Sequence, residues 1–172
     1  MFLIRKYVLI MEKISITMGK AFSFLIVFIL VLQAGESVLR YGFNSPTVWS
    51  WELATLIYGA HFVMGAAWVM TYDGHVRTDM LFIHLPRRIQ SLVELILFPM
   101  LFLPFIGVMI WKCTANAIYS VSIMETTYTQ WGPPFYPLKV LIAFSFVLLL
   151  LQGIAKWLRC FVFFTKGEEI AP

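Results

Sequence analysis

The sequence predicts an all-α integral membrane protein with four transmembrane helices, because it combines high apolar content, few charges and four long apolar runs. Of its 172 residues, 60% are hydrophobic and 13% are charged, whereas soluble domains have about 25% charged residues. A helix needs about 20 apolar residues to cross a hydrocarbon core about 30 Å thick. The runs lie near residues 20–41, 51–72, 91–111 and 138–158. We therefore expect a single membrane domain over residues 1–172.

The distribution of lysine and arginine predicts that both termini face the cytoplasm. Of the 13 basic residues, ten lie before or at the start of the first span, between the second and third spans, or at and after the end of the fourth. Such residues are retained on the cytoplasmic side. The net charge of +4 is therefore explained by topology, and no nucleic acid partner is expected. Cys113 and Cys160 fall on opposite sides in this topology, which argues against a disulfide.

The first thirteen residues predict an amphipathic helix that lies on the inner leaflet, among the headgroups of the membrane lipids. At 100° per residue, Arg5, Lys6, Glu12 and Lys13 fall within one arc of about 120°, and apolar residues fill the opposite side. A start of translation at Met11 is the alternative. A cleaved signal peptide fits less well, because the first apolar run is long and a leucine occupies the small-residue position before a cut.

Polar residues gather where the first span ends. Glu36 and Arg40 are four residues apart on one helical stripe, so an acid and a base can pair there. A lone charge in hydrocarbon costs about 2.5 to 3.5 kcal/mol, so these groups should face protein. Glu52 opens the second span and is a second candidate partner for Arg40 across a short turn. Trp49 is expected at headgroup level.

Two features of the later spans predict helix packing. Glu52, Thr55, Gly59 and Ala66 share a stripe of small or polar residues on the second span, which is how membrane helices approach one another closely. Two prolines, at positions 99 and 104, lie inside the third span. A kinked or locally unwound helix is expected there.

The stretch "YDGHVRTDML", residues 72–81, has an acid, a histidine, an arginine and a second acid within seven positions of an otherwise apolar chain. A zinc site built from His75, His84, Asp73 and Asp79 has no recognised ligand spacing and no cysteine. A haem anchor needs facing histidines, and His61 is the one histidine within a predicted span. No nucleophile is set beside a base in a catalytic pattern. The chain is therefore expected to be non-enzymatic, with no metal or cofactor site.

Three segments resemble one transporter family. "GHVRTDML" resembles the G-H-V-R-V-D-x-L signature of the small membrane subunit (DctQ type) of tripartite ATP-independent periplasmic (TRAP) transporters, with Thr78 where valine is more usual. "LRYGFNSPTVWSWE" resembles the family's R-Y-x-F-N-x-P-x-x-W-x-x-E run. "PPFYPLK" ahead of "LLLLQG" resembles its outer loop and last helix. These segments stand in the family's order and extend from about residue 36 to residue 153.

The resemblance implies a non-catalytic subunit of a bacterial inner-membrane symporter for organic acids. Its partners would be a large membrane subunit (DctM type), where the coupling ion, expected to be sodium, would bind, and a periplasmic substrate-binding protein (DctP type). Signature positions are matched by Arg40, Trp49, Glu52, His75, Arg77 and Asp79. We expect Arg40 and Glu52 to fix the hairpin between the first two spans. We expect His75, Arg77 and Asp79 to fix the cytoplasmic end of the second span.

The longest connection, around residues 116–137, is predicted to lie outside and to help receive the binding protein. Glu125, Tyr128 and Trp131 are the candidate docking residues there, because mixed hydrogen-bonding and aromatic groups are typical of transient protein contacts. Two other functions stay open: a membrane anchor of a redox enzyme, and a small multidrug exporter with Glu36 as its proton-binding acid. Arg40, one turn away, favours a structural pair over the exporter.

Overall fold

The computed structural model describes residues 2–72 and 87–166, and in these ranges the regular structure is helical. The helices are α1 (Phe2–Ser23), α2 (Leu25–Gly42), α3 (Ser50–Thr71), α5 (Arg87–Ser122) and α6 (Tyr136–Lys166). Four helical segments are long and apolar enough to cross a membrane: Leu3–Gly42, Ser50–Thr71, Leu95–Ser122 and Tyr136–Thr165. The predicted fold class is therefore confirmed.

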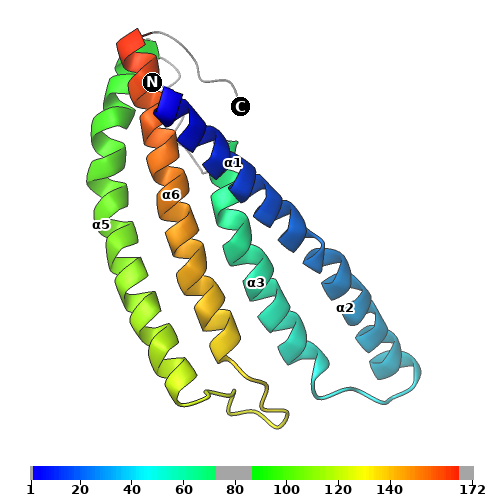
Figure 1. Ribbon diagram of the computed structural model, residues 1–172. Coiled ribbons are helices and arrows are strands. Elements are labelled where there is room, and N and C mark those ends of the chain that lie inside the picture. The colour runs from blue at the N-terminus through cyan, green and yellow to red at the C-terminus, as the bar shows by residue number, and fades with distance from the viewer. Residues whose placement is uncertain (1, 73–86, 167–172) are drawn as a thin grey trace.

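The helices form an open layer rather than a closed bundle. They lie side by side in the order α5, α6, α3, α2, and α1 crosses one face of α6 and α3 (Figure 1). The helices α2 and α5 are thus the two edges of the layer. In α5, only 6% of an 18-residue apolar segment is buried inside the protein. In the continuous segment formed by α1 and α2, the buried share of such a segment is 11%. Both edges therefore expose apolar surface along most of their length.

Helix α1 extends well beyond the thirteen residues predicted to be amphipathic, and it leads into α2 with a single-residue break at Phe24. Its buried face includes Val8, Glu12 and Ser15. The expectation that Glu12 shares a polar face with the N-terminal lysines is wrong, because Glu12 is 6% exposed and forms an ion pair with Arg159 of α6. The positive charge of Arg159 on α6 compensates the Glu12 carboxylate, which allows this acid to lie on the buried side of α1.

The contacts between α1 and α6 show that the two helices cross. The Tyr7 hydroxyl donates to the carbonyl of Leu151 at 3.1 Å, and the Ser15 hydroxyl donates to Oε1 of Gln152 at 2.9 Å. Eight residues of α1 extend over about 12 Å, yet they reach neighbouring residues of α6. Beyond this crossing α1 meets α3, where a β-carbon on Gly19 would lie 2.4 Å from Cβ of Trp68.

Helix α3 forms the centre of the core. Met64 and Ala67 are buried together with Leu148 of α6. Gly59 lies against α6 as the small-residue stripe predicts, because a β-carbon there would meet Leu138 at 3.2 Å. Thr55 of the same predicted stripe is instead exposed, and its hydroxyl donates to the carbonyl of Trp51 within its own helix.

Helix α5 continues through Pro99 and Pro104, and it is bowed in Figure 1. The expected local unwinding does not occur. Since proline has no N–H, Pro99 removes the usual helical donor to the carbonyl of Leu95. The indole Nε1 of Trp157 on α6 donates to this carbonyl at 3.1 Å. A neighbouring helix therefore replaces the missing bond, which allows α5 to stay helical.

Candidate functional site

The loop end of the layer, made by the connections 43–49 and 123–135 and the helix ends that they join, brings together most of the residues singled out in the sequence. Figure 1 places both connections at the end opposite to the start of α1 and the end of α6. Trp49 of the first connection lies 6.4 Å, ring to ring, from Trp131 of the second. The two connections therefore form one continuous surface.

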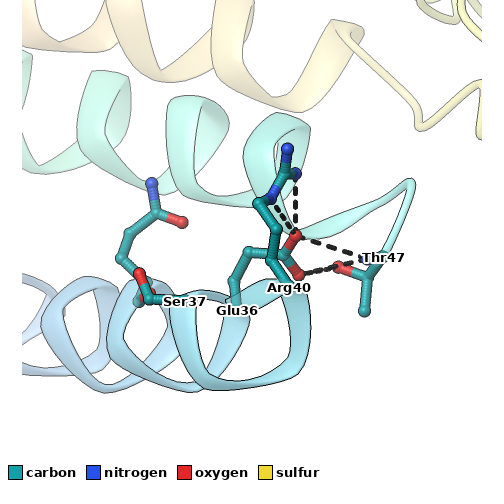
Figure 2. A network of polar contacts seen from close by, with 5 residues as sticks. Glu36, Ser37, Arg40 and Thr47 are labelled. Carbon is teal, nitrogen blue, oxygen red and sulfur yellow. Dashed lines mark hydrogen bonds and ion pairs between the residues drawn. The ribbon is translucent and has the colours of Figure 1, made fainter. Parts of the chain in front are cut away.

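Glu36 fixes the first connection to α2, as Figure 2 shows. Its Oε1 accepts hydrogen bonds from Arg40, at 2.8 Å from Nη2 and 3.2 Å from Nε. The backbone N–H of Thr47 lies 3.3 Å from both carboxylate oxygens, and the Thr47 hydroxyl donates to Oε2. Glu36 is 9% exposed, whereas the Arg40 side chain is 48% exposed. The carboxylate thus closes the turn with both of its oxygens engaged.

Arg40 and Glu52 contact different partners. Arg40 pairs with Glu36, whereas Oε2 of Glu52 accepts hydrogen bonds from Thr129 at 2.7 Å and Thr127 at 3.4 Å. The predicted joint role of Arg40 and Glu52 in the first hairpin is therefore divided in the structure. Arg40 acts within that hairpin, and Glu52 joins the start of α3 to the second connection.

The second connection is itself folded. An isolated bridge pairs Thr126 with Pro134. The N–H of Phe135 donates to the carbonyl of Glu125 at 2.8 Å, and the N–H of Thr127 donates to that of Pro133 at 3.0 Å. Gly132 adopts a φ of +61°, a left-handed conformation that glycine adopts without steric cost. The segment therefore holds its side chains in defined positions.

Glu125 braces the second connection against α5 and α6. Its Oε2 accepts a hydrogen bond from the Ser120 hydroxyl at 2.6 Å and forms an ion pair with Lys139 at 2.5 Å. The hydrogen bonds from Lys139 and then Ser120 hold the pKa of the carboxyl below its ordinary value of 4.5. Lys139 also reaches Asn116 at 3.4 Å. The carboxylate predicted to dock a partner is engaged within the chain.

The side chains that the loop end exposes include three aromatic ones near one another. Tyr128 is fully exposed, and Trp131 and Trp49 are 42% and 41% exposed. We call Trp49, Tyr128 and Trp131 the aromatic pad. The hydrogen bonds of Thr127 and Thr129 to Glu52 hold the residues on either side of Tyr128. The pad therefore presents apolar rings with phenol and indole donors on a fixed backbone.

The remaining signature residues, His75, Arg77 and Asp79, lie outside the described residues, as does His84. His61 lies in α3, and its Nδ1 is 3.0 Å from the carbonyl of Phe22, next to the break between α1 and α2. Among the described residues, no group of three or more His, Cys, Asp or Glu side chains is placed to hold a metal ion.

Sequence reasoning missed three residues that organise this end. Thr47 closes the Glu36 turn, Thr129 bonds Glu52, and Lys139 pairs with Glu125. A signal existed for Thr47, because a hydroxyl residue after Asn44 and Pro46 is typical of a turn. No local spacing predicts the other two, because the partners are 77 positions apart for Thr129 and Glu52 and 14 positions apart for Lys139 and Glu125.

Comparison with known families finds a match in the part of the chain that contains these features. The family model for the DctQ component of tripartite ATP-independent periplasmic transporters matches residues 21–163. No curated protein matches the chain. The matched range covers the loop end and includes all of α2, α3 and α5 and most of α6, whereas nearly all of α1 precedes it.

Proposed function

The chain belongs to the DctQ family of TRAP transporter components, and from this premise we propose that it is the non-catalytic small subunit that packs against and stabilises the large transport subunit. The family and the four apolar helices identify a multi-pass membrane component that works with other components of such a transporter. We further propose that its partners are a DctM-type large subunit and a DctP-type binding protein, and that it lies in the bacterial inner membrane.

The open layer is the observation that supports this proposal best. Helix α5 packs on α6 and α2 packs on α3, and the far sides of these edge helices expose large apolar side chains. Those sides include Leu30 and Val31 on α2, and Met100, Leu101 and Phe105 on α5. Lipid satisfies apolar groups but gives no fixed packing partner, whereas membrane helices associate through close packing. A layer with two open edges is therefore suited to lie against a larger membrane protein.

The polar groups within the described spans support a structural role. The two buried carboxylates, Glu12 and Glu36, are each paired with an arginine. Ser15 and Gln152, both buried, bond to each other where α1 crosses α6. A transport pathway needs groups that bind and release solute or ion, whereas these groups are engaged with one another within the chain. We therefore propose that the large subunit contains the substrate pathway and binds both the organic acid and the coupling ion, which is expected to be sodium. We propose no cofactor for this chain.

The aromatic pad is our candidate for contact with the binding protein. Exposed tyrosine and tryptophan are enriched at protein interfaces and dominate their binding energy. Tyr128 replaces Glu125 as the main candidate, because the Glu125 carboxylate is held by Lys139 and Ser120. Trp131 contributes through its exposed part and through its packing on Trp49.

Uptake of radiolabelled organic acids tests the proposal in cells that express the large subunit and the binding protein, with or without this chain. Uptake is expected with all three proteins and lost when this chain is omitted. Transport by this chain alone would instead support an exporter.

The docking role is tested in the same assay with Tyr128→Ala, which should reduce uptake while the membrane complex stays assembled. Tyr58→Ala is the matched control, because Tyr58 is a half-exposed tyrosine in the middle of α3. Normal uptake by Tyr128→Ala, or equal losses in both variants, would remove the pad from the docking surface.

A further inference from the structure

Helix α1 bears a row of three exposed lysines, Lys6, Lys13 and Lys20. Their spacing of seven residues corresponds to about two helical turns, so the three lie on one face at intervals of about 10.5 Å. Arg5 is exposed beside the first of them. We call Lys6, Lys13 and Lys20 the lysine stripe. It precedes residue 21, where the family match begins.

The charge of the lysine stripe has no compensating acid on its own helix. Glu12 is the one carboxylate of α1, and it lies on the buried face, where it pairs with Arg159. Among the described residues, no acidic side chain forms an ion pair with the stripe. The charged side chains on the exposed face of α1 are therefore all positive, and this face fits a partner with several negative charges.

Apolar side chains accompany the stripe. Leu3, Leu9 and Ile10 are exposed on the same side of α1. A helix with lysines and exposed leucine or isoleucine on its outer side is suited to a membrane surface, where the apolar groups enter the headgroup boundary and the lysines reach phosphates. An acidic protein or a free anion would match the charges but leave these apolar groups in water.

The course of α1 places the stripe near that boundary. The continuous helical segment Leu3–Gly42 has 40 residues, about 60 Å of helix, which is about twice the hydrocarbon thickness. Its first half crosses α6, since Tyr7 and Ser15 reach adjacent residues Leu151 and Gln152. Much of α1 must therefore lie outside the hydrocarbon or run obliquely through the headgroup level.

We propose that the lysine stripe binds the headgroups of anionic phospholipids, with phosphatidylglycerol as the representative ligand. Each lysine contributes one ammonium group to a phosphate, and the stripe receives several lipids in a row. Because the inference rests on α1 and on the membrane location, it does not depend on the identity of the transporter's other subunits.

The test uses the full chain in a neutral mild detergent, titrated with phosphatidylglycerol or phosphatidylcholine. Native mass spectrometry counts bound lipids, and the thermal unfolding midpoint reports stabilisation. A lysine near an anionic surface contributes about 1 kcal/mol, or roughly fivefold in affinity. The half-saturating concentration of phosphatidylglycerol should therefore rise roughly fivefold for Lys13→Gln and about a hundredfold for Lys6→Gln, Lys13→Gln and Lys20→Gln combined. Phosphatidylcholine should produce no comparable effect.

Two control proteins make the result specific to the stripe. Arginine at all three positions keeps the charge, so this variant should bind phosphatidylglycerol as the natural chain does. Lys112→Gln removes one exposed positive charge from α5 and should leave binding unchanged. The proposal is overturned if the triple glutamine variant binds phosphatidylglycerol as tightly as the natural chain, if Lys112→Gln weakens binding as much as Lys13→Gln, or if both lipids bind equally.

Discussion

Trp157 donates its indole N–H to the carbonyl of Leu95 at 3.1 Å, the carbonyl that Pro99 leaves without its helical donor. This bond joins α6 to α5 at the point where α5 would otherwise have an unsatisfied backbone group. In a membrane such a group has no water to bond. The pairing therefore explains how a proline is accommodated within a membrane helix of 36 residues.

We expect Trp157→Phe to destabilise the chain by about 0.5–1.5 kcal/mol, because an aromatic ring is kept and one hydrogen bond is lost. In a Pro99→Ala background the carbonyl of Leu95 regains its helical donor, so the same change should cost less. A double-mutant cycle of unfolding free energies in detergent measures the difference. Equal costs in the two backgrounds would show that the indole bond does not compensate for the proline.

The contact of α1 with α3 predicts a strong effect at Gly19. A β-carbon there would lie 2.4 Å from Cβ of Trp68, an atom that no change of rotamer can move. Gly19→Ala should therefore push the two helices apart and cost about 1–3 kcal/mol. Gly65→Ala is the control, because nothing lies within 4 Å of its added β-carbon. Thermal unfolding of both variants checks this, and equal midpoints would contradict the close packing of α1.

The Glu36 turn predicts an order of effects. Glu36→Ala removes the acceptor for Thr47 and Arg40 and should cost about 1–3 kcal/mol. Arg40→Leu should cost less than about 1 kcal/mol, because the arginine is half-exposed and the Thr47 bonds remain. Ser37→Ala should have little effect, since that hydroxyl bonds only within its own helix, to the carbonyl of Gln33. Chemical unfolding monitored by tryptophan fluorescence measures the free energy of unfolding of the three variants. A Glu36→Ala variant as stable as Ser37→Ala would contradict this assignment.

The Glu125 contacts predict a loss of stability in acid. The carboxyl has a folded-state pKa below 4.5, mainly because of the hydrogen bond from Lys139. The unfolded chain lacks this bond, so the stabilisation is present above the unfolded value and is lost as pH falls through the lower folded value. The natural chain should have a higher unfolding midpoint than Glu125→Gln at neutral pH, and the gap should narrow as the pH falls below 4.5. A gap that persists in acid, or is absent at neutral pH, would contradict this role.

Local patterns in the sequence predicted the spans and the Glu36–Arg40 pair, because hydropathy and four-residue helical spacing depend on neighbouring residues. They did not predict the Glu12–Arg159 pair or the bond from Thr129 to Glu52, whose members are 147 and 77 positions apart. The polarity of Glu12 alone indicated that it lies on an exposed face. It is buried instead, because α6 places Arg159 beside it. Likewise the prolines predicted a disturbed α5, whereas the compensating donor comes from Trp157 on another helix.

The proposed role as a small subunit is tested most directly by the protein composition of a tagged copy purified from its native membrane in mild detergent. We expect one large multi-span membrane protein in equal amount, because the open edges of α2 and α5 pack against it. Purification of the chain alone under conditions that preserve other membrane complexes would contradict this role. So would copurification with a haem protein that shows a Soret band, which would indicate the membrane anchor of a redox enzyme.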